Sequence, residues 1–151
     1  MLEINYRGIN NSLYSLGEGC FTKTNPPEIA GECAPYGVLG GSVAALSGVK
    51  DLEVVQGDGT KVAVGLFLTN AEGNAWENSP AVASGKIAVF QKQGSCNVDV
   101  YEHVEFALGD KLYCSENGFL TNVESANKQV IGVCTKVPTA ASPVLGLDMY
   151  I

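Results

Sequence analysis

The chain has 151 residues, enough for one domain with a proper hydrophobic core, and it carries a net charge of −7. Its nine Lys and Arg residues never cluster in threes, which argues against a nucleic-acid-binding surface. No run of about 18 apolar residues occurs, so we expect no membrane-spanning helix. Charged residues make up only 17% and Gly reaches 18, a balance that favours short strands joined by tight turns.

Residues 1–37 differ from the rest of the chain. Turn-forming runs such as Asn10-Asn11-Ser12 and Asn25-Pro26-Pro27 interrupt every candidate strand or helix. The segment is nevertheless too rich in aromatic residues for a disordered tail. We therefore expect an extended, mostly irregular N-terminal arm. It either lies along another surface, such as a sister subunit or a larger partner, or wraps its own core.

The first residues, Met1 to Arg7, do not form a basic segment followed by an apolar one, so we expect no signal peptide and synthesis in the cytoplasm. The five cysteines are at least 13 positions apart, and one histidine cannot complete a usual zinc site. We expect reduced and mostly buried thiols. The alternative is an intermolecular or late-forming disulfide that uses Cys20 or Cys33.

Residues 38–151 show the alternation of apolar residues that is typical of strands. Strands are expected at 62–69, 85–90, 96–101 and 143–151, with the apolar residues of the last one, Leu145, Leu147, Met149 and Ile151, pointing inward and Asp148 and Tyr150 outward. Gly57-Asp58-Gly59 and Asn117-Gly118 are hairpin signals, the second one typical of a type I′ turn. Trp76 lies in a polar loop, as a lid over the core or as an interface anchor.

A further strand is expected at Val130-Ile-Gly-Val-Cys-Thr. Two glycines, Gly65 and Gly132, fall inside expected strands, where they weaken pairing unless a bulge or a close backbone approach requires them. Such kinks help a small sheet to close on itself. The sequence therefore predicts an all-β fold: a small β-barrel or β-tulip-like sandwich of short antiparallel strands over residues 38–151, preceded by the arm at 1–37.

Catalytic signals are weak. His103 has Glu102 and Glu105 as neighbours, but a surface histidine at a strand end explains the pattern. No serine lies in a Gly-x-Ser-x-Gly sequence, and no glycine run has the form of a phosphate loop. Asp58 and Asp110 lie in turns, where Asp is favoured for local hydrogen bonding. We expect no catalytic site, no metal and no cofactor.

Three segments carry a family resemblance. They read Gly-Asp-Lys-Leu-Tyr-Cys-Ser-Glu-Asn-Gly-Phe-Leu-Thr-Asn at 109–122, Gln-Val-Ile-Gly-Val-Cys-Thr-Lys-Val at 129–137 and Leu-Gly-Leu-Asp-Met-Tyr-Ile at 145–151. This succession resembles the C-terminal part of tailed-bacteriophage head decoration, or cement, proteins. Val62-Ala-Val-Gly-Leu-Phe-Leu looks like the first Val-Gly strand of that family. The resemblance spans residues 38–151 and does not extend to the arm.

The resemblance implies a structural virion protein rather than an enzyme. Such proteins bind the major capsid protein on the outer surface of an icosahedral shell, commonly as homotrimers at threefold or quasi-threefold positions, and stabilise the expanded shell. The expected capsid or subunit contacts are Tyr6, Leu13, Tyr14, Phe21 and Trp76. The alternative is a carbohydrate- or receptor-binding domain on a virion surface, with Trp76 and either Tyr101 or Tyr113 as an aromatic platform.

Overall fold

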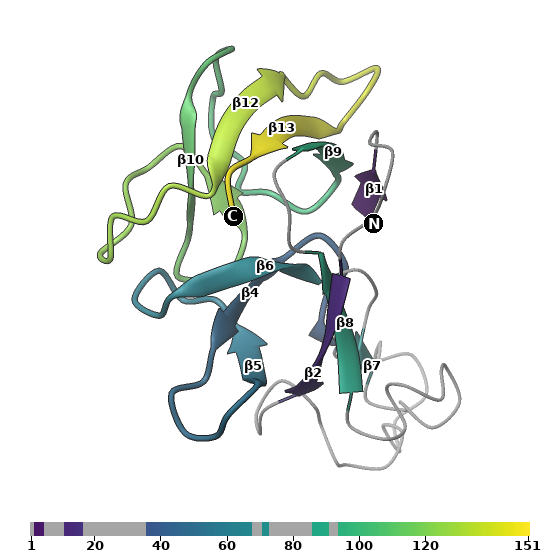
Figure 1. The fold of residues 1–151 in the computed structure, drawn as a ribbon. Coiled ribbons are helices and arrows are strands. Elements are labelled where there is room, and N and C mark those ends of the chain that lie inside the picture. The colour runs from purple at the N-terminus through teal and green to yellow at the C-terminus, as the bar shows by residue number, and fades with distance from the viewer. Residues whose placement is uncertain (1, 5–10, 17–35, 68–70, 73–85, 91–93) are drawn as a thin grey trace, which may run out of the picture.

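The computed structural model describes residues 2–4, 11–16, 36–67, 71–72, 86–90 and 94–151, and these residues form an all-β structure. Two main sheets lie one above the other in Figure 1, and β6 runs along the boundary between them. The prediction of an all-β fold is confirmed. This part of the chain contains no helix that is long and apolar enough to span a bilayer.

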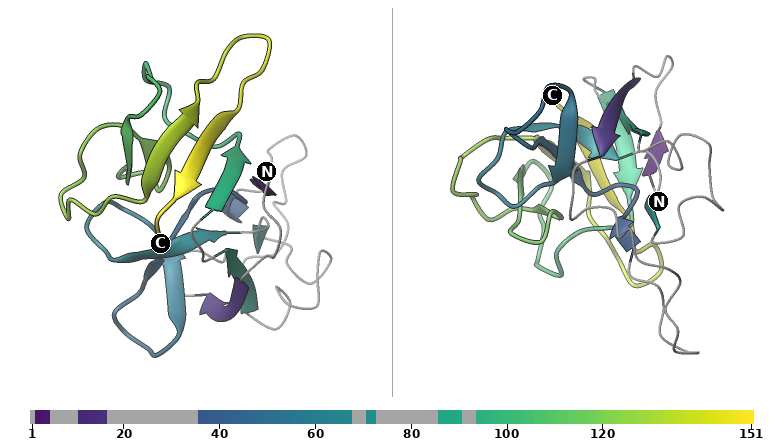
Figure 2. Two further views of the ribbon diagram at one scale, coloured as in Figure 1. Left: turned by 45° about the horizontal axis from the view of Figure 1, so that its top comes forward. Right: turned by 90° about the horizontal axis from the view of Figure 1, so that it is seen from below.

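The first sheet has six antiparallel strands in the order β1-β9-β13-β12-β10-β11. Their bounds are β1 Leu2–Ile4, β9 Gly94–Val98, β13 Leu145–Met149, β12 Gly132–Lys136, β10 Lys111–Cys114 and β11 Leu120–Thr121. The turned views of Figure 2 show β12 and β13 side by side at its centre. Four of these strands come from one stretch of chain, residues 111–149.

The second sheet closes into a five-stranded barrel in the order β2-β5-β4-β6-β8. Its strands are β2 Asn11–Leu16, β4 Val43–Leu46, β5 Glu53–Gln56, β6 Ala63–Phe67 and β8 Lys86–Phe90. The pairing of β2 with β5 is parallel, and the others are antiparallel. A separate pair is formed by β3 (Tyr36–Val38) and β7 (Ala71–Glu72).

The expected N-terminal arm contributes strands to both sheets. β1 pairs with β9, and β2 is bonded on one side to β8 and on the other to β5. β1 and β2 precede the boundary that we drew after residue 37, and they pair with strands that follow it. Of the two alternatives for the arm, packing on its own fold holds for residues 2–4 and 11–16, while residues 5–10 and 17–35 lie outside the described part.

One core joins the sheet to the barrel. Val43, Ala63 and Leu66 of the barrel belong to the same buried cluster as apolar residues of the six-stranded sheet and of the loops that join its strands: Cys96, Val98, Phe106, Leu112, Cys114, Leu120, Ile131, Cys134, Leu145, Leu147 and Met149. The predicted alternation in β13 is confirmed. Its three inward residues are fully buried, Ile151 packs against the cluster, and Asp148 and Tyr150 face solvent.

The two glycines inside strands have the structural roles that the sequence indicated. A Cβ on Gly132 would lie 2.4 Å from the carbonyl oxygen of Asp148, so β12 and β13 approach too closely there for any side chain. Gly65 pairs with Ala44 next to a register shift, at which Val64 is the extra residue of β6.

Two hairpin expectations need correction. Gly57-Asp58-Gly59 does not turn a hairpin, because β5 and β6 lie on opposite sides of β4 and do not pair with each other. Asn117-Gly118 does turn the β10–β11 hairpin, but only Gly118 has a positive φ, of 80°. The Gly118 N–H donates to the Ser115 carbonyl at 3.0 Å. The loop is therefore a longer one that ends in a left-handed glycine, and not a type I′ turn.

Candidate interaction surface

The residues expected to contact a capsid fall into two groups. Tyr6, Phe21 and Trp76 lie outside the described residues. Leu13 and Tyr14 lie in β2, where their backbone pairs with Ala88 and Ile87 of β8. The structure therefore places two of the five residues, and both lie in the strand β2.

The cysteines and the histidine give no reactive site in the described part of the chain. Cys96, Cys114 and Cys134 are reduced and buried, as expected. Burial raises the pKa of Cys96 to about 12 and that of Cys114 to about 11, so neither is a thiolate near neutral pH. His103 is exposed, as expected, and its ring packs edge-on against Tyr101.

The aromatic platform suggested for the alternative function needs correction. Tyr113 is only 8% exposed in β10 and offers no ring face to a ligand. Tyr101 is half-buried, with its ring in edge contact with His103 and Phe106 at centroid distances of 5.8 and 5.9 Å. It lines a hollow of about 550 Å³ together with Pro138 and Pro143.

A second hollow, of about 540 Å³, lies where the loop after β5 meets the β10–β11 turn. We call it the groove. Its lining comes from residues 58–60, 102, 104, 114–117, 121 and 123–126. The barrel supplies the first of these segments, and the chain around the six-stranded sheet supplies the rest.

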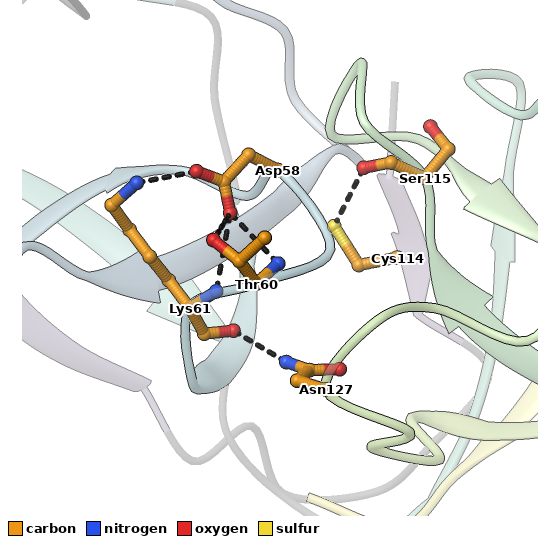
Figure 3. A network of polar contacts seen from close by, with 6 residues as sticks. All are labelled: Asp58, Thr60, Lys61, Cys114, Ser115 and Asn127. Atoms are coloured by element: carbon orange, nitrogen blue, oxygen red, sulfur yellow. Dashed lines mark hydrogen bonds and ion pairs between the residues drawn. The ribbon is translucent and has the colours of Figure 1, made fainter.

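Asp58 fixes the barrel side of the groove (Figure 3). Its Oδ1 accepts hydrogen bonds from the Thr60 backbone N–H at 2.9 Å, the Thr60 hydroxyl at 2.7 Å and the Lys61 N–H at 3.1 Å, while Oδ2 pairs with the Lys61 ammonium. Partial burial raises the pKa of Asp58, but these bonds outweigh it and hold the pKa well below its usual range. The role expected for Asp58, local bonding in a turn, is confirmed.

Two amide side chains join this loop to the six-stranded sheet. Asn127 Nδ2 donates to the Lys61 carbonyl at 2.7 Å, as Figure 3 shows. Gln129 makes two bonds to one residue of β6: its Oε1 accepts from the Ala63 N–H at 2.7 Å and its Nε2 donates to the Ala63 carbonyl at 2.9 Å. The Gln129 amide thus bonds to β6 as a neighbouring strand would.

The β10–β11 turn forms the opposite wall and is also bonded to the barrel. The Val43 N–H donates to the Gly118 carbonyl at 2.8 Å, and Gln56 Nε2 donates to the Asn117 carbonyl at 2.8 Å. A Cβ at Gly118 would lie 2.9 Å from the Gly57 carbonyl oxygen, so glycine is required there by contact as well as by φ. Both walls are therefore held in place by the contact between sheet and barrel.

Glu102 holds the conformation of the turn. Its Oε1 accepts hydrogen bonds from the Ser115 hydroxyl at 2.6 Å and from Asn117 Nδ2 at 2.9 Å. The Ser115 oxygen in turn accepts from the N–H groups of Asn117 and Phe119, both at 3.2 Å. The bonds from Ser115 and Asn117 lower the pKa of Glu102, so it stays ionised at neutral pH.

The groove is acidic and partly apolar. Four carboxylates line it, those of Asp58, Glu102, Glu116 and Glu124, and no Lys or Arg among the described residues does. The nearest cations on these loops form ion pairs: Lys61 with Asp58, and Lys128 with Glu124 at 3.8 Å. Val104 and Val123 add exposed apolar surface. Sequence reasoning missed this grouping because it combines residues 58, 102 and 116–124, which only the packing of the two sheets brings together.

Comparisons with known proteins do not place the chain. No model of a known protein family matches it, and no curated protein sequence does.

Within the described residues, no three His, Cys, Asp or Glu side chains gather as they would around a metal ion.

Proposed function

We propose that this protein is a structural virion protein that binds the outer surface of an icosahedral phage capsid and stabilises the expanded shell. The partner is the major capsid protein, and the protein acts as a homotrimer at threefold or quasi-threefold positions. The proposal rests on the resemblance of residues 109–122, 129–137 and 145–151 to head decoration proteins. One structural observation supports it: these segments form β10, β11, β12 and β13, neighbouring strands of a single sheet.

Exposed apolar side chains at one end of the barrel support a binding role. Val49 and Leu52, in the loop between β4 and β5, are 79% and 68% exposed. Val62 is also exposed, and its carbonyl accepts a bond from the Leu46 N–H at 2.9 Å, which places it beside that loop. Leu52 has a φ of 55°, a conformation that a branched residue rarely adopts. The binding energy that these side chains can supply is modest for one subunit, but the energies of contacts repeated over a shell add up.

The direct test uses expanded capsids that lack the protein. Purified protein is mixed with them and sedimented, and capsid survival is measured on heating. We expect co-sedimentation and a higher temperature of capsid rupture. Absence of both would overturn the proposal. Size-exclusion chromatography with light scattering tests the trimer on the isolated protein: a trimeric mass means that it forms in solution, and a monomeric mass leaves trimer formation to the shell.

A carbohydrate- or receptor-binding domain on a virion surface is the second candidate. Tyr101 supports it, because its ring lines a hollow and aromatic rings present flat apolar faces with a polar edge. A glycan array separates the two candidates. Glycan binding that is lost in Tyr101→Ala, without capsid binding, would favour the second.

A further inference from the structure

The groove combines two features of a protein-docking site. Val104 and Val123 present apolar surface to solvent, and the walls on either side are held by hydrogen bonds to β4, β5 and the loop that precedes β6. A preformed groove does not have to be ordered when a partner binds, which reduces the entropy lost on binding.

The charges of the groove are of one sign and remain available. Both hydrogen bonds to the Glu102 carboxylate fall on Oε1, and within the described residues Oε2 has no partner. Glu116 and Glu124 are exposed, and Glu124 has only the long contact to Lys128. The hydrogen bonds to Asp58 and Glu102 keep both ionised well into the acidic range.

We infer that the groove binds an extended cationic segment of a partner protein, in which Lys or Arg alternates with small apolar residues. In such a segment, alternate side chains point in opposite directions. The apolar ones would lie against Val104 and Val123, and the long, flexible Lys and Arg side chains, which leave the segment on its other side, would bend back to Glu102, Glu116 and Glu124. Under the proposed function, on which this identification of the partner rests, the segment belongs to the major capsid protein. The net charge of −7 would attract it from a distance.

The test uses a defined peptide, acetyl-Gly-Lys-Val-Arg-Val-Lys-Gly-amide, titrated into the full isotope-labelled protein and followed by NMR. We expect shift changes centred on the backbone amides of residues 59–60, 115–117 and 123–126. Affinity should fall several-fold as salt rises from about 0.05 to about 0.3 M, because exposed charges are screened. A peptide with Glu in place of Lys and Arg should not bind.

The variant pair is chosen for equal charge change. E116K/E124K reverses two carboxylates of the groove, and E105K/D148K reverses two exposed carboxylates that lie outside it. We expect about tenfold weaker peptide binding for the first pair and less than about twofold for the second. Spectra of the free variants show whether each is folded. No peptide binding, or equal losses in the two pairs, would overturn the inference.

Capsid binding separates this inference from the proposed function. If wild-type protein binds capsids, E116K/E124K should bind them more weakly than E105K/D148K does, and equal capsid binding by the two would overturn the assignment of the groove to the capsid protein. If wild-type protein binds the peptide at the groove but not the capsid, the decoration proposal fails while the groove remains a cationic-segment site.

Discussion

The six-stranded sheet and the barrel are assembled from the chain in different ways. In the sheet, β10 to β13 come from residues 111–149, and only β9 and β1 are brought from farther away. The barrel closes through β2, which is more than 35 residues away from β5 and more than 70 from β8. Closing such long loops loses more chain entropy than closing short ones. The sheet therefore depends mainly on its own segment, whereas the barrel depends on a distant one.

The largest expected effect comes from removing β2. Deletion of residues 1–16 takes away β1 and also the strand that pairs with β5 and β8, which opens the ring. We expect hydrogen exchange to accelerate strongly in β5 and β8, and much less in β10, β12 and β13. Uniform protection after deletion would contradict the dependence of the barrel on β2.

A core substitution in the sheet should have the next largest effect. Leu147 is fully buried in β13 within the cluster that sheet and barrel share, so Leu147→Ala should lower the free energy of unfolding by about 2–5 kcal/mol. The neighbouring Asp148 is exposed, and Asp148→Ala should change the free energy of unfolding by less than about 0.5 kcal/mol. Urea unfolding measures both. Similar values for the two would mean that β13 is not buried as described.

The contact between the two regions can be weakened through Gln129. Gln129→Ala leaves the N–H and the carbonyl of the buried Ala63 without these two bonds, and we expect a loss of about 1–3 kcal/mol. Gln129→Glu should behave similarly, because a carboxylate cannot donate to the Ala63 carbonyl. Glu124→Ala, at an exposed position nearby, is the control. In Gln129→Ala, the rate of hydrogen exchange should increase more at β6 than at β13. An equal increase in both strands would contradict a local role of Gln129.

The smallest effect concerns pH. The pKa of Glu102 is lower in the folded protein than in the unfolded chain, so its stabilisation is present above the unfolded pKa and is lost as pH falls through the folded one. Between about pH 5 and pH 3, the free energy of unfolding should fall more for the wild-type protein than for Glu102→Gln. The difference between the two losses should be less than about 1 kcal/mol, because the site is near solvent. Parallel pH profiles from urea unfolding would contradict this.

The same contrast explains what the sequence could predict. The alternation in β13, the β10–β11 hairpin and the close approach at Gly132 depend on neighbours in the chain, and the pattern indicated all three. The prediction of a hairpin at residues 57–59 was wrong because hairpin signals describe strands that pair with each other, whereas β4 lies between β5 and β6. The strands in the N-terminal segment were missed because turn formers surround them and their partners lie far along the chain.

The candidate site also contains some contacts that the sequence indicates and others that it does not. Asp58 was expected to bond to its own turn, and its bonds to Thr60 and Lys61 are local ones that a single sequence can indicate. The bonds from Ser115 and Asn117 to Glu102 span 13 and 15 residues, and nothing in the sequence around Glu102 indicates them. An acidic groove made of such contacts becomes visible only after the strands are paired.

Closure of the barrel has a consequence for crowding. Each of its five strands is bonded on both sides, although β2 meets β5, and β6 meets β8, over two residue pairs only, so no strand of the barrel is an edge strand over its whole length. The six-stranded sheet ends in β1 and β11, which are only three and two residues long. Edges this short are poor templates for strand addition from another molecule. Among the strands that the structure describes, the six-stranded sheet and the barrel therefore offer another copy no long edge strand, even at very high local concentration.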